Sequence, residues 1–255
     1  YQDLRKKQNS DQYEFILPNI MYGKTFFTEK FGVVNLKSNA LYSKYSTNKQ
    51  KTFLTNDIIW SPPSKVTKNG FVNTLEGMLR NTNYETSKTN TYKDGDMVNE
   101  LNAVLARKTS LPLRKDGINY SNLFSPNFMI RYAPGHMRDI SDSNSSLNYA
   151  NLYDLNKTSE IEQGLSAVLG FDFNVNKKDK DDNLNEKFKL SMGQVYNFEH
   201  NDDIPAQSSL DQKMSDVVGE MKYNFSEIGN IDYKFSVDHN FQNVNYNEIS
   251  TELNI

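Results

Sequence analysis

The chain has 255 residues, with 29 Lys and Arg against 32 Asp and Glu and therefore a net charge of −3. This balance gives no electrostatic reason to expect a nucleic-acid partner, because such a partner normally requires a basic face. The absence of Cys excludes disulfides, Cys-based zinc sites and thiol catalysis. No apolar run approaches the roughly 18 residues that a membrane helix needs, which excludes a helical membrane protein.

The composition points to strands with one wet face. Only 36% of the residues are hydrophobic, yet 12% are aromatic, with 15 Tyr and 15 Phe. Low apolar content is typical of disordered chains, but such chains are poor in aromatic residues. A polar chain rich in Tyr, Phe and Asn suits long β-strands that bury or cover one face and leave the other in water.

Alternation of apolar and polar residues, which indicates β-strands, recurs along the chain, whereas helical spacing is sustained nowhere. Weaker stretches occupy 33–45, 52–60, 71–84 and 97–107. A long stretch follows at 118–132, the clearest ones lie at 165–175, 188–198 and 231–241, and weaker ones at 217–225 and 249–255. The sequence predicts about eleven strands.

The length of these strands favours a membrane barrel. Many would run for 10–15 residues, whereas strands of soluble proteins cluster near five or six and a tilted membrane-spanning strand needs about 9–11. We predict an all-β fold: a section of an antiparallel transmembrane β-barrel. Residues 1–255 are expected to belong to a single barrel domain that is truncated at both ends, because the final alternation is still running at the last residue. A soluble β-sandwich or solenoid with one core face is the alternative.

Turn residues separate the predicted strands. The pairs Asn69-Gly70, Asp94-Gly95 and Asp116-Gly117 predict tight hairpin connections, and a short Gly-containing turn is expected at 226–230. The longest connection is predicted at about 134–160.

No pattern of residues indicates catalysis, a metal or a cofactor. The three His residues, His136, His200 and His239, share no ligand spacing with one another or with carboxylates. We place His239 in the apolar phase of a strand near its end, where an interfacial ring is expected rather than a metal ligand. Nucleotide-binding and hydrolase motifs are absent from the sequence, so we expect no enzyme, no metal and no cofactor.

Charged residues within the strands form the candidate site. A charge on the lipid face of a barrel costs roughly 2–4 kcal/mol at the midplane, so these side chains are expected to face the lumen. They either solvate a wide lumen or line a path for an amphiphile with anionic head groups. The residues are Glu76, Arg80, Arg131, Lys189, Glu220 and Lys222.

Four segments resemble the LPS-assembly outer-membrane protein family LptD, in the same order along the chain. They are YEFILPNIMY (13–22), LARKTSLPL (105–113), FSPNFMIRYAPGHMRDIS (124–141) with the loop element after it, and EKFKLSMGQVYNFE (186–199). Glu14 stands where the family has a basic residue, and Tyr153 where it usually has Phe. The positions that fit the family pattern are Pro18, Arg107, Pro112, Pro126, Tyr132, Pro134, Asn151, Leu152, Gly193 and Gln194.

The resemblance implies a non-enzymatic outer-membrane translocon that assembles lipopolysaccharide into the outer leaflet. It also implies a plug lipoprotein of the LptE kind and a periplasmic bridge that delivers lipopolysaccharide to an N-terminal domain. The lateral-gate strands and the Cys residues of that family are expected outside this segment, so no residue here receives those roles. The alternatives are a porin-like diffusion channel, a soluble binding module and an outer-membrane phospholipase or protease.

Overall fold

The structure is a computed structural model that describes residues 2–3, 13–45, 48–89, 92, 95–179, 183–226 and 228–253. Two compact units result, Tyr1–Pro63 with Glu76–Val104 and Ser64–Leu75 with Leu105–Ile255. Fourteen strands and two short 3-10 helices make up the regular elements of the described residues, and every strand pairing is antiparallel. The predicted all-β antiparallel fold is confirmed.

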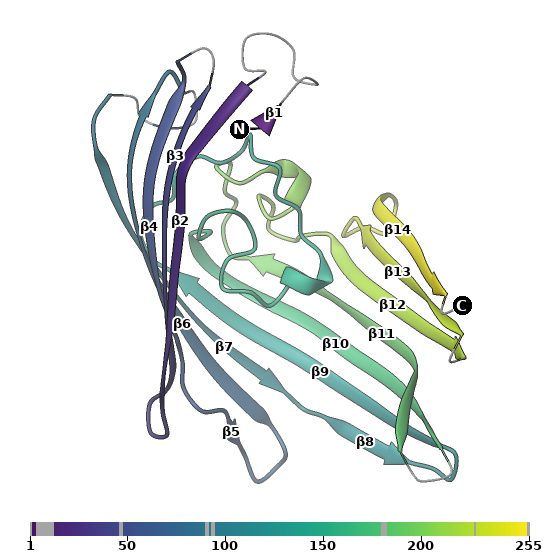
Figure 1. The fold of residues 1–255 in the computed structure, drawn as a ribbon. Helices are drawn as coiled ribbons and strands as arrows, with labels where there is room; N and C mark the ends of the chain where they lie inside the picture. The colour runs from purple at the N-terminus through teal and green to yellow at the C-terminus, as the bar shows by residue number, and fades with distance from the viewer. Residues whose placement is uncertain are drawn as a thin grey trace. The chain divides into compact units, whose positions relative to one another are not determined.

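In the first unit the hydrogen-bonded strand order is β1-β2-β3-β4-β6-β7 (Figure 1). Strand β6 begins in the second unit and continues into the first, and β7 begins in the first unit and ends in the second. The bounds are β1 (Gln2–Asp3), β2 (Tyr13–Thr28), β3 (Gly32–Tyr45), β4 (Gln50–Ser61), β6 (Val72–Ser87) and β7 (Val98–Ser110).

In the second unit the order continues from the end of β7 through β9, β10, β11, β12 and β13 to β14, while short β5 pairs with β6 and short β8 with β9. Figure 1 shows the chain between β9 and β10 folded over one face of these strands. The bounds are β5 (Lys65–Val66), β8 (Leu113–Asp116), β9 (Tyr120–Ala133), η1 (Tyr149–Asn151), β10 (Gly164–Lys178), β11 (Leu184–Asn197), η2 (Ala206–Ser208), β12 (Val217–Ser226), β13 (Gly229–Val237) and β14 (Val244–Leu253).

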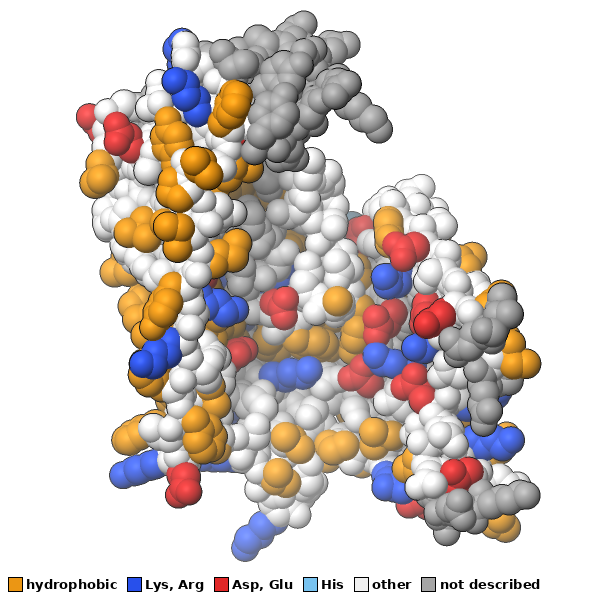
Figure 2. Space-filling view, in the orientation of Figure 1, with side chains coloured by type: hydrophobic (Ala, Val, Ile, Leu, Met, Phe, Trp, Pro, Cys, Tyr) orange, Lys and Arg blue, Asp and Glu red, His pale blue; other side chains and the backbone are white. Residues whose placement is uncertain are grey.

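The strands are long and two-faced, as the alternation predicts. Eleven strands of the described residues have nine residues or more. In β4, Leu54, Ile58 and Trp60 share one face because they alternate along the strand, and they are 43%, 43% and 37% exposed. Figure 2 shows hydrophobic side chains spread over this part of the surface. An apolar face left open in this way is typical of a sheet that meets lipid.

Two prolines explain why β7 and β8 are separate strands. The ladder between β7 and β9 ends at Ser110 opposite Asn127, and the ladder between β8 and β9 begins at Leu113 opposite Phe124. Pro112 and Pro126 fall in the gap between these ladders, and proline has no N–H to donate to a ladder. The Leu111 N–H donates to the Pro126 carbonyl at 3.1 Å across this gap.

A third proline sits at an irregularity of β2. The pairing of β2 with β3 shifts between Ile16 and Asn19, and Pro18 lies inside this shift. A residue without an N–H is tolerated within a strand where the regular ladder is interrupted, as at a bulge. The family-like positions Pro18, Pro112 and Pro126 therefore all mark places where strand pairing is broken.

The turns follow the predicted residues, with two corrections at strand ends. Gly70 and Gly117 lie in the connections β5–β6 and β8–β9, and Asp94 lies outside the described residues. His239 was predicted on a strand, but β13 ends at Val237. Asp238 closes a turn there, because its carboxylate accepts from the Gln242 N–H at 2.7 Å.

The second correction concerns Ile118, which was predicted within a strand. Strand β9 begins at Tyr120, and Ile118 is 94% exposed in the turn before it. The Gly117 N–H donates to the Tyr120 carbonyl at 2.8 Å, which turns the chain just before the strand. Alternation continues past the ends of strands in both places because a turn residue can match the period by chance.

Candidate functional site

The sheet of the second unit has one apolar and one polar face because its register places like residues opposite each other. Phe171 of β10 lies opposite Met192 of β11, and the next residue, Asp172, lies opposite Ser191. The polar face continues over β11 to β14, where Figure 2 shows Lys and Arg side chains interspersed with Asp and Glu. The candidate site lies on this polar face.

The connection between β9 and β10, residues 134–163, docks on the polar face, and we call it the docked loop. Leu152 of the loop is fully buried. A Cβ added at Gly193 would lie 2.6 Å from Leu152 Cδ2, and one added at Gly170 would lie 2.5 Å from the Tyr153 hydroxyl. Gly170 and Gly193 face each other across β10 and β11. This glycine pair makes room for the loop, because any larger residue would collide with it.

Asp172 fixes the loop beside the glycine pair. One carboxylate oxygen accepts from the Tyr149 hydroxyl and from Ser191 Oγ, each at 2.7 Å, and the other accepts from Asn127 Nδ2 at 2.8 Å. Burial and the hydrogen bond to Asp172 raise the pKa of Tyr149, so its hydroxyl keeps the proton that it donates. Tyr149 thus ties the loop to β10 over a wide pH range.

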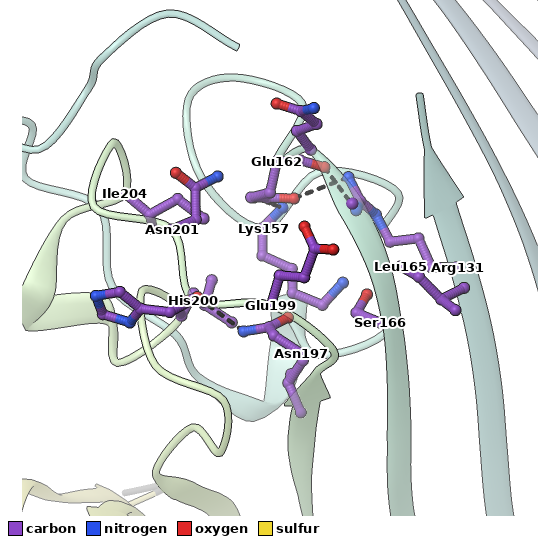
Figure 3. A pocket seen from close by; sticks show the side chains of 14 residues that line it. Arg131, Lys157, Glu162, Leu165, Ser166, Asn197, Glu199, His200, Asn201 and Ile204 are labelled. Atoms are coloured by element: carbon purple, nitrogen blue, oxygen red, sulfur yellow. Dashed lines mark hydrogen bonds and ion pairs between the residues drawn. The ribbon is translucent and has the colours of Figure 1, made fainter. Parts of the chain in front are cut away.

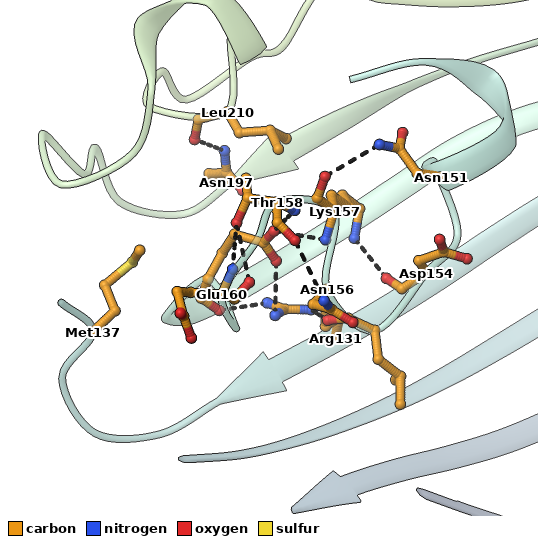
Figure 4. Close-up of polar contacts among 12 residues, drawn as sticks. Arg131, Met137, Asn151, Asp154, Asn156, Lys157, Thr158, Glu160, Asn197 and Leu210 are labelled. Atoms are coloured by element: carbon orange, nitrogen blue, oxygen red, sulfur yellow. Dashed lines mark hydrogen bonds and ion pairs between the residues drawn. The ribbon is translucent and has the colours of Figure 1, made fainter. Parts of the chain in front are cut away.

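Arg131, at the end of β9, holds the far part of the docked loop. Its side chain is 2% exposed and pairs with the Glu162 carboxylate at 3.0 Å. The guanidinium also donates to the carbonyls of Leu155 at 2.5 Å and of Glu162 at 2.7 Å. Figure 4 shows these contacts converging on Arg131 from the surrounding loop. One planar cation therefore donates hydrogen bonds to two loop carbonyls and forms an ion pair with one carboxylate.

Around this ion pair the loop binds itself. Glu162 accepts from the backbone N–H groups of Lys157 at 2.6 Å and of Thr158 at 2.5 Å. Asn151 donates to the carbonyls of Ser146 at 3.0 Å and of Lys157 at 3.1 Å (Figure 4). The Asn151 amide therefore supplies hydrogen bonds that regular secondary structure would otherwise provide. Without them the loop would bury these two carbonyls with no hydrogen-bond donor.

Lys157 is the buried cation beside Arg131. Its ammonium donates to the Asp154 carbonyl at 3.0 Å. Burial, and then the charge of Arg131, lower the pKa of Lys157 to about 8. The loop therefore holds a lysine whose proton is less tightly bound than in water.

This shift predicts a pH dependence of the free energy of unfolding. A cation whose pKa is lowered in the folded state costs stability below that pKa, and the cost disappears as pH rises from about 8 to the unfolded value of 10.5. We expect the stability of the unmodified protein, relative to Lys157→Met, to rise over this window, by up to about 3 kcal/mol. Urea unfolding of both proteins at pH 7 and at pH 10.5 measures it, and a constant difference would contradict the assignment.

A polar cavity of about 200 Å³ lies next to this cluster (Figure 3). Arg131, Lys157 and Glu162 line one part, and Glu199 and His200 line another. The connection of residues 198–216 provides the second part and is bound to the docked loop. The Ile140 N–H donates to the Asp203 carbonyl at 2.8 Å, and Gln207 Nε2 donates to the Ser143 carbonyl at 2.8 Å. The two connections therefore form one substructure on the sheet.

The structure groups four of the six predicted site residues in the second unit. Besides Arg131, these are Lys189, which donates to Glu220 at 2.6 Å, and Lys222, which lies opposite Lys189 and Asp232 in the register. They occupy the face on which the loop docks. Arg131 is buried beneath the docked loop, and the orientation of this face toward a lumen stays a prediction.

The other two predicted site residues belong to the first unit. Arg80 donates twice to the carboxylate of Asp57, at 2.7 and 2.9 Å, across β6 and β4. Glu76 accepts from Ser61 Oγ at 3.0 Å. Both side chains are held by neighbours on adjacent strands, and the orientation toward a lumen stays a prediction here as well.

The comparison with known families decides the identity of this arrangement. The family model described as LPS transport system D, LptD, matches residues 1–254. The chain belongs to the LptD family. LptD proteins are outer-membrane proteins that serve lipopolysaccharide transport, so the predicted family is confirmed. A search of curated proteins found no match.

Within this LptD-family chain, three of the positions that carried the resemblance, Asn151, Leu152 and Gly193, meet at the docked loop. Leu152 packs on Gly193, Asn151 organises the loop, and Gln194 Nε2 donates to the Ser215 carbonyl at 2.7 Å. Tyr132 lies near the end of β9, and Pro134 is the first residue of the docked loop. Arg107 lies on β7, and its Nη2 donates to Asn73 Oδ1 at 2.9 Å.

Sequence analysis missed the residues that receive the loop. Gly170 and Asp172 lie in the stretch predicted at 165–175 but were given no role. A glycine in the interior of each of two adjacent long strands indicates that another segment approaches closely there. This signal could have predicted the role of Gly170 and Gly193. Lys157 and Glu162 gave no signal, because a charged loop is ordinarily solvated.

Two other features are absent from the described part of the chain. No helix there has the length and apolar character to cross a membrane. No group of three or more His, Cys, Asp or Glu residues is arranged there to hold a metal ion.

Proposed function

We propose that this chain is a wall section of the translocon that assembles lipopolysaccharide into the outer leaflet of the outer membrane. The observation that carries the proposal is the match to the LptD family over residues 1–254. The sheet supports it, because long two-faced strands suit a wall with lipid on one side and a wet interior on the other. In this role the chain supplies wall, interior surface and loops, and performs no chemical reaction.

The proposal includes the rest of the domain and its partners. Residues 1–255 would be part of one outer-membrane barrel domain, because open sheet edges in lipid leave backbone groups unpaired at several kcal/mol each. A plug lipoprotein of the LptE kind would occupy the interior, and a periplasmic bridge would deliver lipopolysaccharide. Family membership supports these partners, and sequencing the gene beyond both ends of the chain tests the domain.

A porin-like channel is the second candidate that the sequence raised. A porin needs a constriction with acidic residues facing basic ones across an open passage. In the docked loop, Arg138 pairs with Glu160 and Glu162 with Arg131, so these charges hold the loop together. Their pairing favours the translocon.

Depletion of the full-length protein in its own host tests the proposal. We expect lipopolysaccharide at the surface of intact cells, measured by antibody labelling, to fall and to recover when the gene is restored. Single-channel recording on the purified full-length protein provides the second measurement. Unchanged surface lipopolysaccharide together with a steady open conductance would contradict the translocon and support the porin.

A further inference from the structure

A second cavity, of about 530 Å³, lies between the docked loop and strands β12 to β14. Asn144, Ser146 and Asn148 of the loop line one side of it. Asp216 at the start of β12, with Ser236 of β13 and Asn245 of β14, lines the other. We call this cavity the amide pocket. It exists because the loop docks on β10 and β11 and leaves the neighbouring strands uncovered beside it.

A fixed hydrogen-bond acceptor lies in the amide pocket. Asp216 is 9% exposed, and its Oδ2 atom accepts from Ser236 Oγ at 2.7 Å and from Asn245 Nδ2 at 2.8 Å. Its backbone N–H donates to Ser209 Oγ at 2.8 Å. Both side-chain bonds fall on one oxygen, so Oδ1 retains its capacity to accept. A carboxylate that neutral donors hold in place in this way can accept a hydrogen bond from the hydroxyl group of a ligand.

The facing wall offers donors. Asn148 Oδ1 accepts from the Asn151 N–H at 3.1 Å, which fixes the side chain and leaves its Nδ2 group as a donor. Asn144 and Ser146 add an exposed amide and an exposed hydroxyl. The rings of Tyr149 and Tyr246 also line the pocket. A fixed acceptor opposite amide donors, with aromatic surface beside them, matches a sugar ring, whose hydroxyls both donate and accept hydrogen bonds and whose C–H faces are apolar.

The charges of the pocket select a neutral ligand over an anionic one. Lys234, the cation in the lining, pairs with Glu248 at 3.3 Å. Glu220, also in the lining, pairs with Lys189 at 2.6 Å. Asp216 then leaves the pocket slightly acidic, which repels phosphate groups. We propose that the amide pocket binds a sugar ring. This inference rests on the proposed function, under which the sugar belongs to the saccharide part of lipopolysaccharide.

Calorimetric titration of the purified full-length protein tests this assignment. The probe is the dephosphorylated oligosaccharide of lipopolysaccharide, freed of lipid A, and inorganic phosphate is the second probe. Ser146→Trp fills the pocket while it keeps the backbone carbonyl that Asn151 uses. Asp142→Trp adds the same ring to an exposed site of the same loop outside the pocket. We expect Ser146→Trp to weaken oligosaccharide binding at least tenfold and Asp142→Trp to leave it unchanged.

The outcomes separate this inference from the transport proposal. Oligosaccharide that does not bind, that binds equally to Ser146→Trp, or that inorganic phosphate displaces would overturn the pocket assignment. The amount of lipopolysaccharide at the cell surface after depletion tests the transport proposal independently. If depletion leaves it unchanged while Ser146→Trp still abolishes binding, the pocket stands and the transport proposal falls.

Discussion

Replacement of Gly193 by alanine is expected to release the docked loop. The new Cβ would lie 2.6 Å from Leu152 Cδ2 and 2.7 Å from the Leu169 carbonyl oxygen. The side chain can move, but the backbone of β10 cannot, so the strain falls on the pairing of β10 with β11 or on the loop. We expect a loss of about 1–3 kcal/mol in the free energy of unfolding, the usual cost of overpacking a tight contact. Limited proteolysis should cut residues 134–163 faster in the variant.

Gly23→Ala is the matched control for this variant. Gly23 also lies inside a long strand, but its added Cβ would meet one atom, the Leu36 carbonyl oxygen, at 3.9 Å, an ordinary contact. This variant should keep the proteolysis rate of the unmodified protein. Equal rates for Gly193→Ala and Gly23→Ala would show that the loop does not depend on the glycine pair.

The strands and their faces could be predicted from the sequence because the period of two is a local property. Phe171 and Asp172 fall on opposite faces of any strand that contains them both, whatever lies around it. The sequence also carries a local signal for the break between β7 and β8, because Pro112 and Pro126 both lack a backbone N–H. That the two prolines face the same gap depends on register, which no local pattern sets.

The docked loop could not be predicted, because its contacts join residues far apart in sequence. Arg131 was predicted to face a lumen, where it would solvate the interior or line a path for an amphiphile. Its partners Leu155 and Glu162 lie 24 and 31 residues along the chain. Lys157 reads as a solvated loop residue until the fold buries it. Charge patterns predict a polar face. Only the fold shows which of these charges form the ion pairs that hold a segment against that face.

The docked loop also determines which part of the polar face remains open. Where it packs, the paired charges and glycines are covered, and the side chains that can meet a ligand are those beside it. The amide pocket occupies this uncovered margin, between the loop and β12 to β14. A variant that undocks the loop should therefore remove one wall of the pocket, so Gly193→Ala is expected to weaken oligosaccharide binding as well.

Replacement of Arg131 by methionine is expected to have the largest effect on stability. The side chain is 2% exposed and the paired Glu162 side chain 8%. Removal of one partner leaves the other charge buried, and such a loss typically costs about 3–5 kcal/mol. Two loop carbonyls lose their donor at the same time. Urea unfolding of the full-length protein in micelles, followed by the heat-dependent gel shift of folded barrels, measures the loss.

Two further variants decide whether burial is the cause. Arg114 pairs with Asp116 at 2.9 Å, but these side chains are 54% and 50% exposed. Arg114→Ala should therefore cost less than about 1 kcal/mol, because exposed pairs are screened by water. The double variant Arg131→Met with Glu162→Gln should be more stable than Arg131→Met alone, since it no longer buries an unpaired carboxylate. If Arg131→Met costs no more than Arg114→Ala, the docked loop is not held by this ion pair.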